Sequence, residues 1–312
     1  MVFRVESDDM NLFLLTLIAP AMWAFSNHFD KYIVSRYFKD ATIGAMMVFS
    51  ALIALAVLPV AYIFQDQAFS IGVVMPLVLI LNGCLYLLAV QLYLMALRIS
   101  DTSTAVPILQ VTPVVSFVLA YWILGESLSS QQMLGGSLIV LGALAISIEM
   151  NGGSRPSWRL DVLGLMFLSS FLFALQYLLF KLFAIKTNFW TTMFWESVGF
   201  IGFGVFLLMF ITSYRRDFFN VFGKGGWVVG INLLGEIANL TGKISFNYVS
   251  LLIPITLAWV GVGFQPLFIL IYSVILTIFF PHIAQEKVLG VHLAQKAAAV
   301  GVMLVGSYIL NG

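Results

Sequence analysis

Hydrophobic residues occur along this chain in long blocks that short polar breaks separate. A helix rises about 1.5 Å per residue, so about 20 consecutive apolar residues cross the hydrocarbon core of a bilayer. Turn residues and charges divide the chain into ten such blocks, which predict helices at residues 11–33, 42–64, 73–97, 102–124, 131–149, 161–185, 190–212, 226–248, 251–280 and 291–310. The pattern predicts an all-α integral membrane protein, and its short connections leave no room for a soluble domain.

The eighth block combines an apolar composition with a regular series of polar residues. These residues recur at helical spacing, at Asn232, Glu236, Asn239, Lys243 and Asn247. They therefore share one face of a helix. A charged side chain at the centre of a spanning helix costs roughly 2.5 to 3.5 kcal/mol. This polar stripe is thus expected to face protein or water, as the wall of a path through the membrane.

Composition supports the membrane assignment and excludes several classes of protein. Of the 312 residues, 61% are hydrophobic and only 9% are charged, and the mean hydropathy is +1.03. So few charges cannot cover the surface of a soluble domain of this size. The net charge of +1, without a basic run, gives no indication of a nucleic-acid partner.

Cysteine and histidine offer little for metal or catalytic chemistry. The single cysteine, Cys84, excludes an intrachain disulfide, and the three histidines lack ligand spacing. We expect no metal, no cofactor and no catalytic site. The acidic start of the chain argues against a cleaved signal peptide, so the first block is expected to remain as a helix.

Two halves of the chain, residues 1–150 and 151–312, are weakly similar to each other. Asn151-Gly-Gly-Ser-Arg-Pro lies between them and is typical of a linker. A shift of 150 residues places Asn82 beside Asn232 and residues 93–100 beside residues 243–250. Because each half holds five predicted spans, an odd number, the halves would lie in the membrane with opposite orientation. Such inverted repeats are the usual construction of secondary transporters.

The segment from Arg98 to Leu144 carries a more specific pattern. A polar hairpin at residues 100–104 is followed by a helix containing Pro113, then by Gly125-Glu126, Leu128, Gln132, Gly135 and Gly142. In this pattern the chain resembles the EamA-like ten-helix transporters of the drug/metabolite transporter (DMT) superfamily. The second half retains Gln265-Pro266 and a glycine-spaced last helix but lacks the Gly-Glu pair.

This resemblance implies a bundle of two inverted five-helix repeats around a central cavity. It implies that helices 1, 3, 4, 6, 8 and 9 line the cavity, and that the activity is efflux or exchange of small metabolites. The 150-residue shift sets the polar stripe against Asn82, Tyr86 and Tyr93 on the third helix. The first half would then supply an aromatic wall, and the second half a charged one.

Further polar and aromatic residues are candidates for the same cavity. Glu236 and Lys243 lie about 10.5 Å apart along a helix axis, too far for contact, so each needs a cavity or a partner on another helix. For Glu196 the sequence leaves two positions open, one in a cavity and one at the membrane interface. The predicted substrate-binding residues are Asn82, Tyr86, Tyr93, Gln110, Lys181, Asn232, Glu236, Asn239, Lys243, Trp259 and Gln265.

The sequence thus favours a secondary transporter of a small polar or amphipathic metabolite, with amino acids or their derivatives as the first candidates. Glu236 is the candidate proton carrier, because a carboxylate in an apolar cavity can exchange a proton. An exchanger of organic anions or nucleotide sugars is the alternative, favoured by Lys31, Lys181 and Lys243. A membrane enzyme acting on lipid-linked substrates would need a polar catalytic loop, and the connections are too short for one.

The expected partners are the substrate, the bilayer of the cell membrane and protons, with the protein a monomer or weak homodimer. Orientation stays open. Nine Lys and Arg residues at the odd-to-even connections, against two on the face with the termini, place both termini outside by the positive-inside rule. The family resemblance implies that both are inside.

Overall fold

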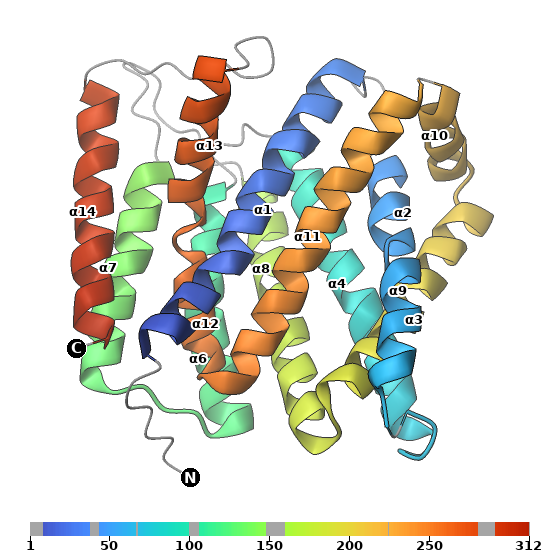
Figure 1. Cartoon of the computed structure of the whole chain (residues 1–312), viewed down its shortest axis with the longest axis horizontal. Coiled ribbons are helices and arrows are strands. Elements are labelled where there is room, and N and C mark those ends of the chain that lie inside the picture. The colour runs from blue at the N-terminus through green and yellow to red at the C-terminus, as the bar shows by residue number, and fades with distance from the viewer. Residues whose placement is uncertain are drawn as a thin grey trace.

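The computed structural model describes residues 9–37, 44–66, 68–99, 106–147, 160–223, 225–279 and 291–311, and every regular element in these ranges is a helix. Figure 1 shows the helices side by side in one bundle. The first half contains α1 (Asp9–Tyr37), α2 (Gly44–Leu52), α3 (Ala54–Phe64), α4 (Val74–Ile99), the 3-10 helix η1 (Val106–Val111), α6 (Thr112–Leu124) and α7 (Ser130–Ser147). The second half contains α8 (Leu160–Lys186), α9 (Phe189–Phe210), α10 (Thr212–Gly223), α11 (Gly226–Leu252), α12 (Ile255–Val262), α13 (Gln265–Phe279) and α14 (Val291–Asn311).

The helices confirm a multi-pass membrane protein. Within the described ranges, six segments are long and apolar enough to cross a bilayer, at Leu12–Phe29, Gly44–Phe64, Val74–Ala96, Leu160–Lys186, Phe189–Phe210 and Ile255–Phe279. Each of the ten predicted blocks coincides with one helix or with two consecutive helices. That all ten cross the membrane stays a prediction.

Three of the predicted blocks each form two consecutive helices rather than one. Proline lies at or just before the start of three helices. Pro113 occupies the first turn of α6, Pro254 precedes α12, and Pro266 is the second residue of α13. Proline is favoured in the first turn of a helix, because the N–H that it lacks has no partner there.

Helix α10 was not predicted. Its sequence lies in a stretch that was interpreted as a polar connection, and it packs against α2 and α9. Asp217, Phe218 and Val221 are buried on one side of this helix, whereas Arg215 and Arg216 are exposed. The helix is therefore amphipathic, and its charged side gave it the appearance of a loop.

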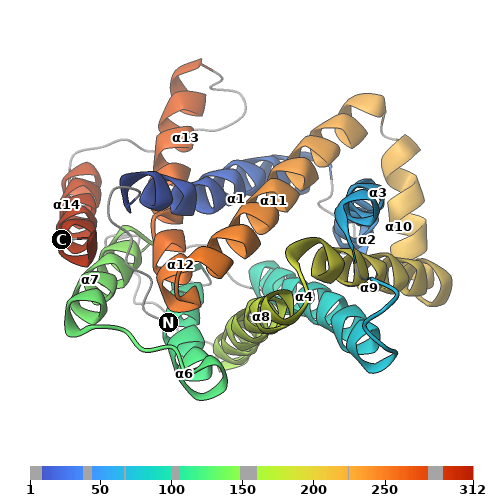
Figure 2. The ribbon, with the colours of Figure 1, turned by 60° about the horizontal axis from the view of Figure 1, so that its bottom comes forward.

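Each half packs its first helix against a helix of the other half. Helix α1 lies along α11, and α8, the first helix of the second half, lies along α4. These two pairings join the first helix of each half to the third predicted span of the other half. Helices α7 and α14 form a separate pair at one side of the bundle (Figures 1 and 2).

Glycine allows the closest of these contacts. A Cβ atom on Gly135 would lie 2.6 Å from the carbonyl oxygen of Gly306, and one on Gly306 would lie 2.8 Å from that of Gly135. Gly199 of α9 meets the backbone of Ile80 on α4 in the same way, at 2.2 Å. Gly135, Gly142 and Gly306 thus allow α7 and α14 to pack closely.

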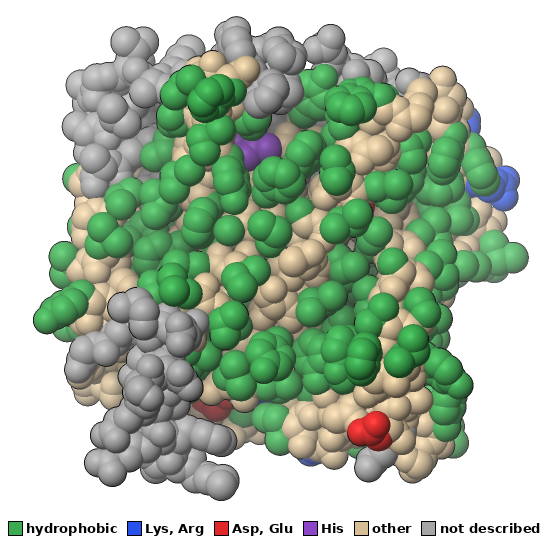
Figure 3. Space-filling model, viewed as in Figure 1, with side chains coloured by type: hydrophobic (Ala, Val, Ile, Leu, Met, Phe, Trp, Pro, Cys, Tyr) green, Lys and Arg blue, Asp and Glu red, His purple; other side chains and the backbone are tan. Residues whose placement is uncertain are grey.

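The face that carries α1, α11 and α13 is covered largely by apolar side chains. In Figure 3 the charged side chains drawn on this face lie near its edges. Exposed Leu234, Ile237, Ile271 and Ile275 belong to α11 and α13. This distribution is the one expected of a surface in contact with lipid tails.

Candidate functional site

A cavity lies between helices of the two halves, with a volume of about 170 Å³. Aromatic side chains form much of its wall, with several polar side chains among them. The described lining residues are Trp23, Ser26, Asn27, Met46, Ser50, Tyr86, Val90, Tyr93, Leu94, Leu109, Thr112, Pro113, Phe173, Tyr177, Glu236, Asn239, Trp259, Val262, Gln265, Pro266 and Ile269. Pockets for drug-sized ligands measure about 300–1,000 Å³, so this cavity suits a smaller solute.

Glu236 is the charged residue among the described residues that line the cavity. It is 7% exposed, and its Oε1 accepts a hydrogen bond of 2.5 Å from the Ser50 hydroxyl on α2. The contact joins the third predicted span of the second half to the second span of the first half. Glu236 therefore stands in the cavity wall at a contact between the two halves.

Tyr177 and Trp259 are the lining residues of α8 and α12 nearest the lower side of Figure 1, because α8 descends and α12 ascends in that view. Both belong to a layer of four aromatic residues whose rings contact one another. We call this layer the aromatic floor; its members are Trp23, Tyr177, Phe246 and Trp259. The ring centroids of Tyr177 and Trp259 lie 5.3 Å apart, and those of Phe246 and Trp259 lie 4.7 Å apart. Among the described residues the buried Trp259 Nε1 donor has no hydrogen-bond partner.

The polar stripe of α11 meets two different environments. Glu236 and Asn239 line the cavity, whereas Lys243 and Asn247 lie farther along the helix and contact α9. The face of the helix is the same, but its neighbour changes along the axis. The stripe as a whole was expected to line one path, but within the described lining only Glu236 and Asn239 of its five residues face the cavity.

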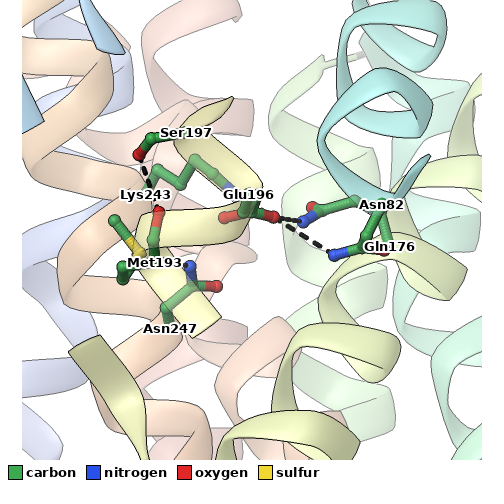
Figure 4. A network of polar contacts seen from close by, with 7 residues as sticks. All are labelled: Asn82, Gln176, Met193, Glu196, Ser197, Lys243 and Asn247. Atoms are coloured by element: carbon green, nitrogen blue, oxygen red, sulfur yellow. Dashed lines mark hydrogen bonds and ion pairs between the residues drawn. The ribbon is translucent and has the colours of Figure 1, made fainter. Parts of the chain in front are cut away.

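Lys243 forms a buried ion pair with Glu196, a residue of α9. Lys243 Nζ lies 3.3 Å from Glu196 Oε1, and the two side chains are 2% and 0% exposed. Figure 4 shows Glu196 between Lys243 on one side and Asn82 and Gln176 on the other. The same Oε1 accepts a hydrogen bond of 3.2 Å from Asn82 Nδ2 and another from Gln176 Nε2.

These contacts place Glu196 at the meeting point of four helices, α4, α8, α9 and α11. Glu196 is fully buried and is not among the described residues that line the cavity, so it faces neither the cavity nor the outer surface of the bundle. Lys243 Nζ also lies 4.6 Å from the ring centroids of both Tyr86 and Tyr177, which line the cavity. The ammonium therefore lies behind the cavity wall, where its charge is compensated by Glu196 and by two ring faces.

An ion pair, together with the two backbone groups that it contacts, lies below the aromatic floor, and we call this group the lower cluster. It consists of Glu126, Lys181, Ile253 and Ile255. Glu126 and Lys181 form an ion pair, with side chains 16% and 7% exposed. Lys181 Nζ donates to the Ile253 carbonyl at 2.8 Å, and Glu126 Oε2 accepts from the Ile255 backbone N–H at 2.9 Å.

Gly125 determines where Glu126 lies. With φ of 67°, Gly125 ends α6 in the left-handed conformation, which glycine adopts without steric cost. The chain turns at this residue, and the next side chain reaches α8 and the start of α12. The Gly-Glu pair of the sequence motif thus has a physical role, because the glycine makes the turn and the glutamate makes the contacts.

The structure brings six of the predicted substrate-binding residues to the cavity. These are Tyr86, Tyr93, Glu236, Asn239, Trp259 and Gln265. That they bind a substrate stays a prediction. The Gln110 side chain lies outside the described residues.

Four predicted site residues lie away from the described cavity lining, and three of them contact glutamates on other elements instead. Asn82 and Lys243 are held by Glu196, and Lys181 is held by Glu126. Asn232 is buried on α11, one turn before Glu236. A polar residue in a membrane helix needs a partner, and these contacts between helices supply partners for the first three.

Sequence reasoning missed Ser50 and Glu126 as members of these sites, and it left the position of Glu196 open. The Gly125-Glu126 pair was identified as a family motif, but its partner Lys181 is 55 residues away and no pattern links them. Glu196 lies 47 residues from Lys243, with the linking contacts made only in three dimensions. A search for an opposite charge for each buried lysine could have found both glutamates.

Comparison with known proteins supports the membrane-transporter assignment for the first half. Residues 10–148 match the EamA-like transporter family. A crystal structure matches with a TM-score of 0.65 over 96% of this chain and 98% of its own, at 13% identity. At this identity the likeness shows the fold alone. No curated protein matches the chain.

Proposed function

Because residues 10–148 belong to the EamA-like transporter family, within the DMT superfamily, we propose that this chain is a secondary transporter of a small amphipathic metabolite that carries an amino group. Amino acids and their derivatives are the first candidates. The observation that carries the proposal is the cavity between the two halves. Glu236 is the charged residue in its described lining, and the other described lining residues are aromatic, apolar or neutral polar. A carboxylate among aromatic rings suits an ammonium group attached to an apolar body.

The proposed mechanism is alternating access between two inverted five-helix repeats. The exchange of first helices between the halves, α1 onto α11 and α8 onto α4, is the packing expected from such repeats. Small rotations of one repeat against the other would change which end of the cavity is closed. Glu236 and Ser50 come from opposite halves, so this movement would lengthen or break the hydrogen bond between them.

The alternative, an exchanger of organic anions or nucleotide sugars, is less well supported by the contacts of the buried lysines than by the sequence alone. It rested on three lysines, of which Lys181 and Lys243 are each compensated by a glutamate. The side chain of the third, Lys31, lies outside the described residues. A cavity of about 170 Å³ is also small for a nucleotide sugar.

Transport by purified protein in liposomes tests the proposal. Liposomes are loaded with unlabelled amino acids, small aromatic amines, organic anions or nucleotide sugars, and uptake of the labelled counterpart is followed. We expect uptake of solutes that combine an amino group with an apolar part, and weaker uptake by Glu236→Gln. Asp66→Asn, which removes an exposed carboxylate of the α3–α4 connection, is the matched control. Counterflow of anions alone, unaffected by Glu236→Gln, would contradict the proposal.

A further inference from the structure

The lower cluster occupies a particular position relative to the cavity. Lys181 follows Tyr177 by one helical turn on α8, and Ile255 precedes Trp259 by one turn on α12. Helix α8 descends toward the lower end of Figure 1, whereas α12 ascends from it. The lower cluster therefore lies about 6 Å beyond the aromatic floor on both helices. A solute leaving the cavity toward this end would meet the rings first and the ion pair next.

The cluster joins elements from both halves of the chain. Glu126 lies between α6 and α7 in the first half, whereas Lys181, Ile253 and Ile255 belong to the second half. Figure 2, in which this end comes forward, shows α6, α8 and α12 side by side. A movement that separated the halves at this end would have to break the ion pair.

The two charges also match the helix ends that they contact. Lys181 donates to the last carbonyl before Pro254, at the end of α11, and Glu126 accepts from the first N–H after it, at the start of α12. The carboxyl end of a helix attracts a cation, and the amino end attracts an anion. Pro254 interrupts the backbone hydrogen bonding there, so these two side chains satisfy groups that would otherwise lack partners.

We propose that Glu126 and Lys181 form the gate that closes the lower end of the cavity and that opens when the transporter exposes its site to that side of the membrane. The proposal rests on the proposed transport function but concerns a separate group of residues. In the closed state the ion pair and both helix-end contacts are formed. In the open state Glu126 moves away with α6 and α7, and water hydrates both charges and the backbone groups beside Pro254.

Accessibility of the cavity to a thiol reagent tests the gate without measuring transport. The native Cys84 is replaced by alanine, and Val262, which lines the cavity on α12, is replaced by cysteine as a reporter. A membrane-impermeant maleimide is then added to proteoliposomes from the side of the lower cluster. We expect Glu126→Gln and Lys181→Met to increase the labelling rate about tenfold, the shift that loss of a charge-assisted hydrogen bond produces in a two-state equilibrium.

Two control variants separate the gate from a general effect of charge. Lys186→Met removes a lysine that is exposed at the end of the same helix, and it should leave the labelling rate unchanged. Lys181→Arg retains the charge and should retain the closed state. Equal labelling rates in the parent, Glu126→Gln and Lys181→Met would overturn the proposal. Gel filtration and thermal unfolding establish whether each variant is folded. If Lys181→Met does not fold, the labelling rate of Glu126→Gln alone tests the gate.

A charge exchange tests the role of the helix ends. The double variant E126K/K181E can form an ion pair, but it places a cation at the start of α12 and an anion at the end of α11. We expect its labelling rate to stay elevated. A rate as low as that of the parent would overturn the assigned role of the helix-end contacts. A normal labelling response in a protein that transports none of the tested solutes would contradict the proposed function and leave the gate intact.

Discussion

Lys243 Nζ lies 3.3 Å from Glu196 Oε1, and this contact joins α11 to α9 where both side chains are buried. The first prediction concerns the cost of leaving one of these charges alone. Lys243→Met or Glu196→Gln should each destabilise the protein by about 3–5 kcal/mol, because a buried charge without its partner is strongly unfavourable. Thermal unfolding of the purified protein in detergent measures the effect.

The double variant K243M/E196Q serves as the control for that prediction. This variant removes both charges of the pair. Its loss of stability should therefore be much smaller than the sum of the losses in the two single variants. Additive losses would show that the two residues stabilise the protein independently, and the ion pair would then have little energetic importance.

The second prediction concerns proton coupling by Glu236. Glu236→Gln should abolish the dependence of transport on a proton gradient while the protein stays folded, because an amide cannot take up or release a proton there. The measurement is uptake into liposomes with and without an imposed pH difference. Ser50→Ala, which removes only the 2.5 Å hydrogen bond to the carboxylate, should retain the proton dependence. Unchanged proton dependence in Glu236→Gln would exclude the coupling role.

Trp259 provides a third prediction, on substrate affinity. Trp259→Phe keeps an aromatic ring in the floor but removes the buried Nε1 donor. We expect roughly a 2- to 10-fold loss of apparent affinity, the contribution of one hydrogen bond of about 0.5–1.5 kcal/mol. Isothermal titration with the best transported solute gives the value. If the affinity of Trp259→Phe equals that of the parent, Nε1 makes no hydrogen bond to that solute.

The fourth prediction concerns the pairing of α7 with α14. Gly135→Ala places a methyl group 2.6 Å from the Gly306 carbonyl oxygen, so the helices must separate. We expect a destabilisation of about 1–3 kcal/mol. Gly301→Ala on α14, where the added methyl meets no atom within 4 Å, should leave the melting temperature unchanged or slightly raised. Equal melting temperatures for both variants would show that the α7–α14 contact adjusts without cost.

The sequence predicts the positions of the helices well because hydrophobic block length is a local property. It also predicts that Glu236 belongs to a cavity, since a charge in a spanning helix must face protein or water. It cannot predict the partner of Lys243, because Glu196 lies on another helix and nothing local distinguishes it. For the same reason, Lys181 was assigned to the cavity, one turn from Tyr177, although its partner Glu126 holds it below the floor.

The ion pair between α9 and α11 also bears on how the chain enters the membrane during synthesis. Helix α9 carries Glu196 and is made first, whereas Lys243 emerges 47 residues later. Until then the carboxylate lacks its cation, and Asn82 and Gln176, which are made earlier, are the donors at hand. We therefore expect α9 to stay against α4 and α8, or within the translocon, until α11 is released, so that insertion of this region proceeds by groups of helices rather than one helix at a time.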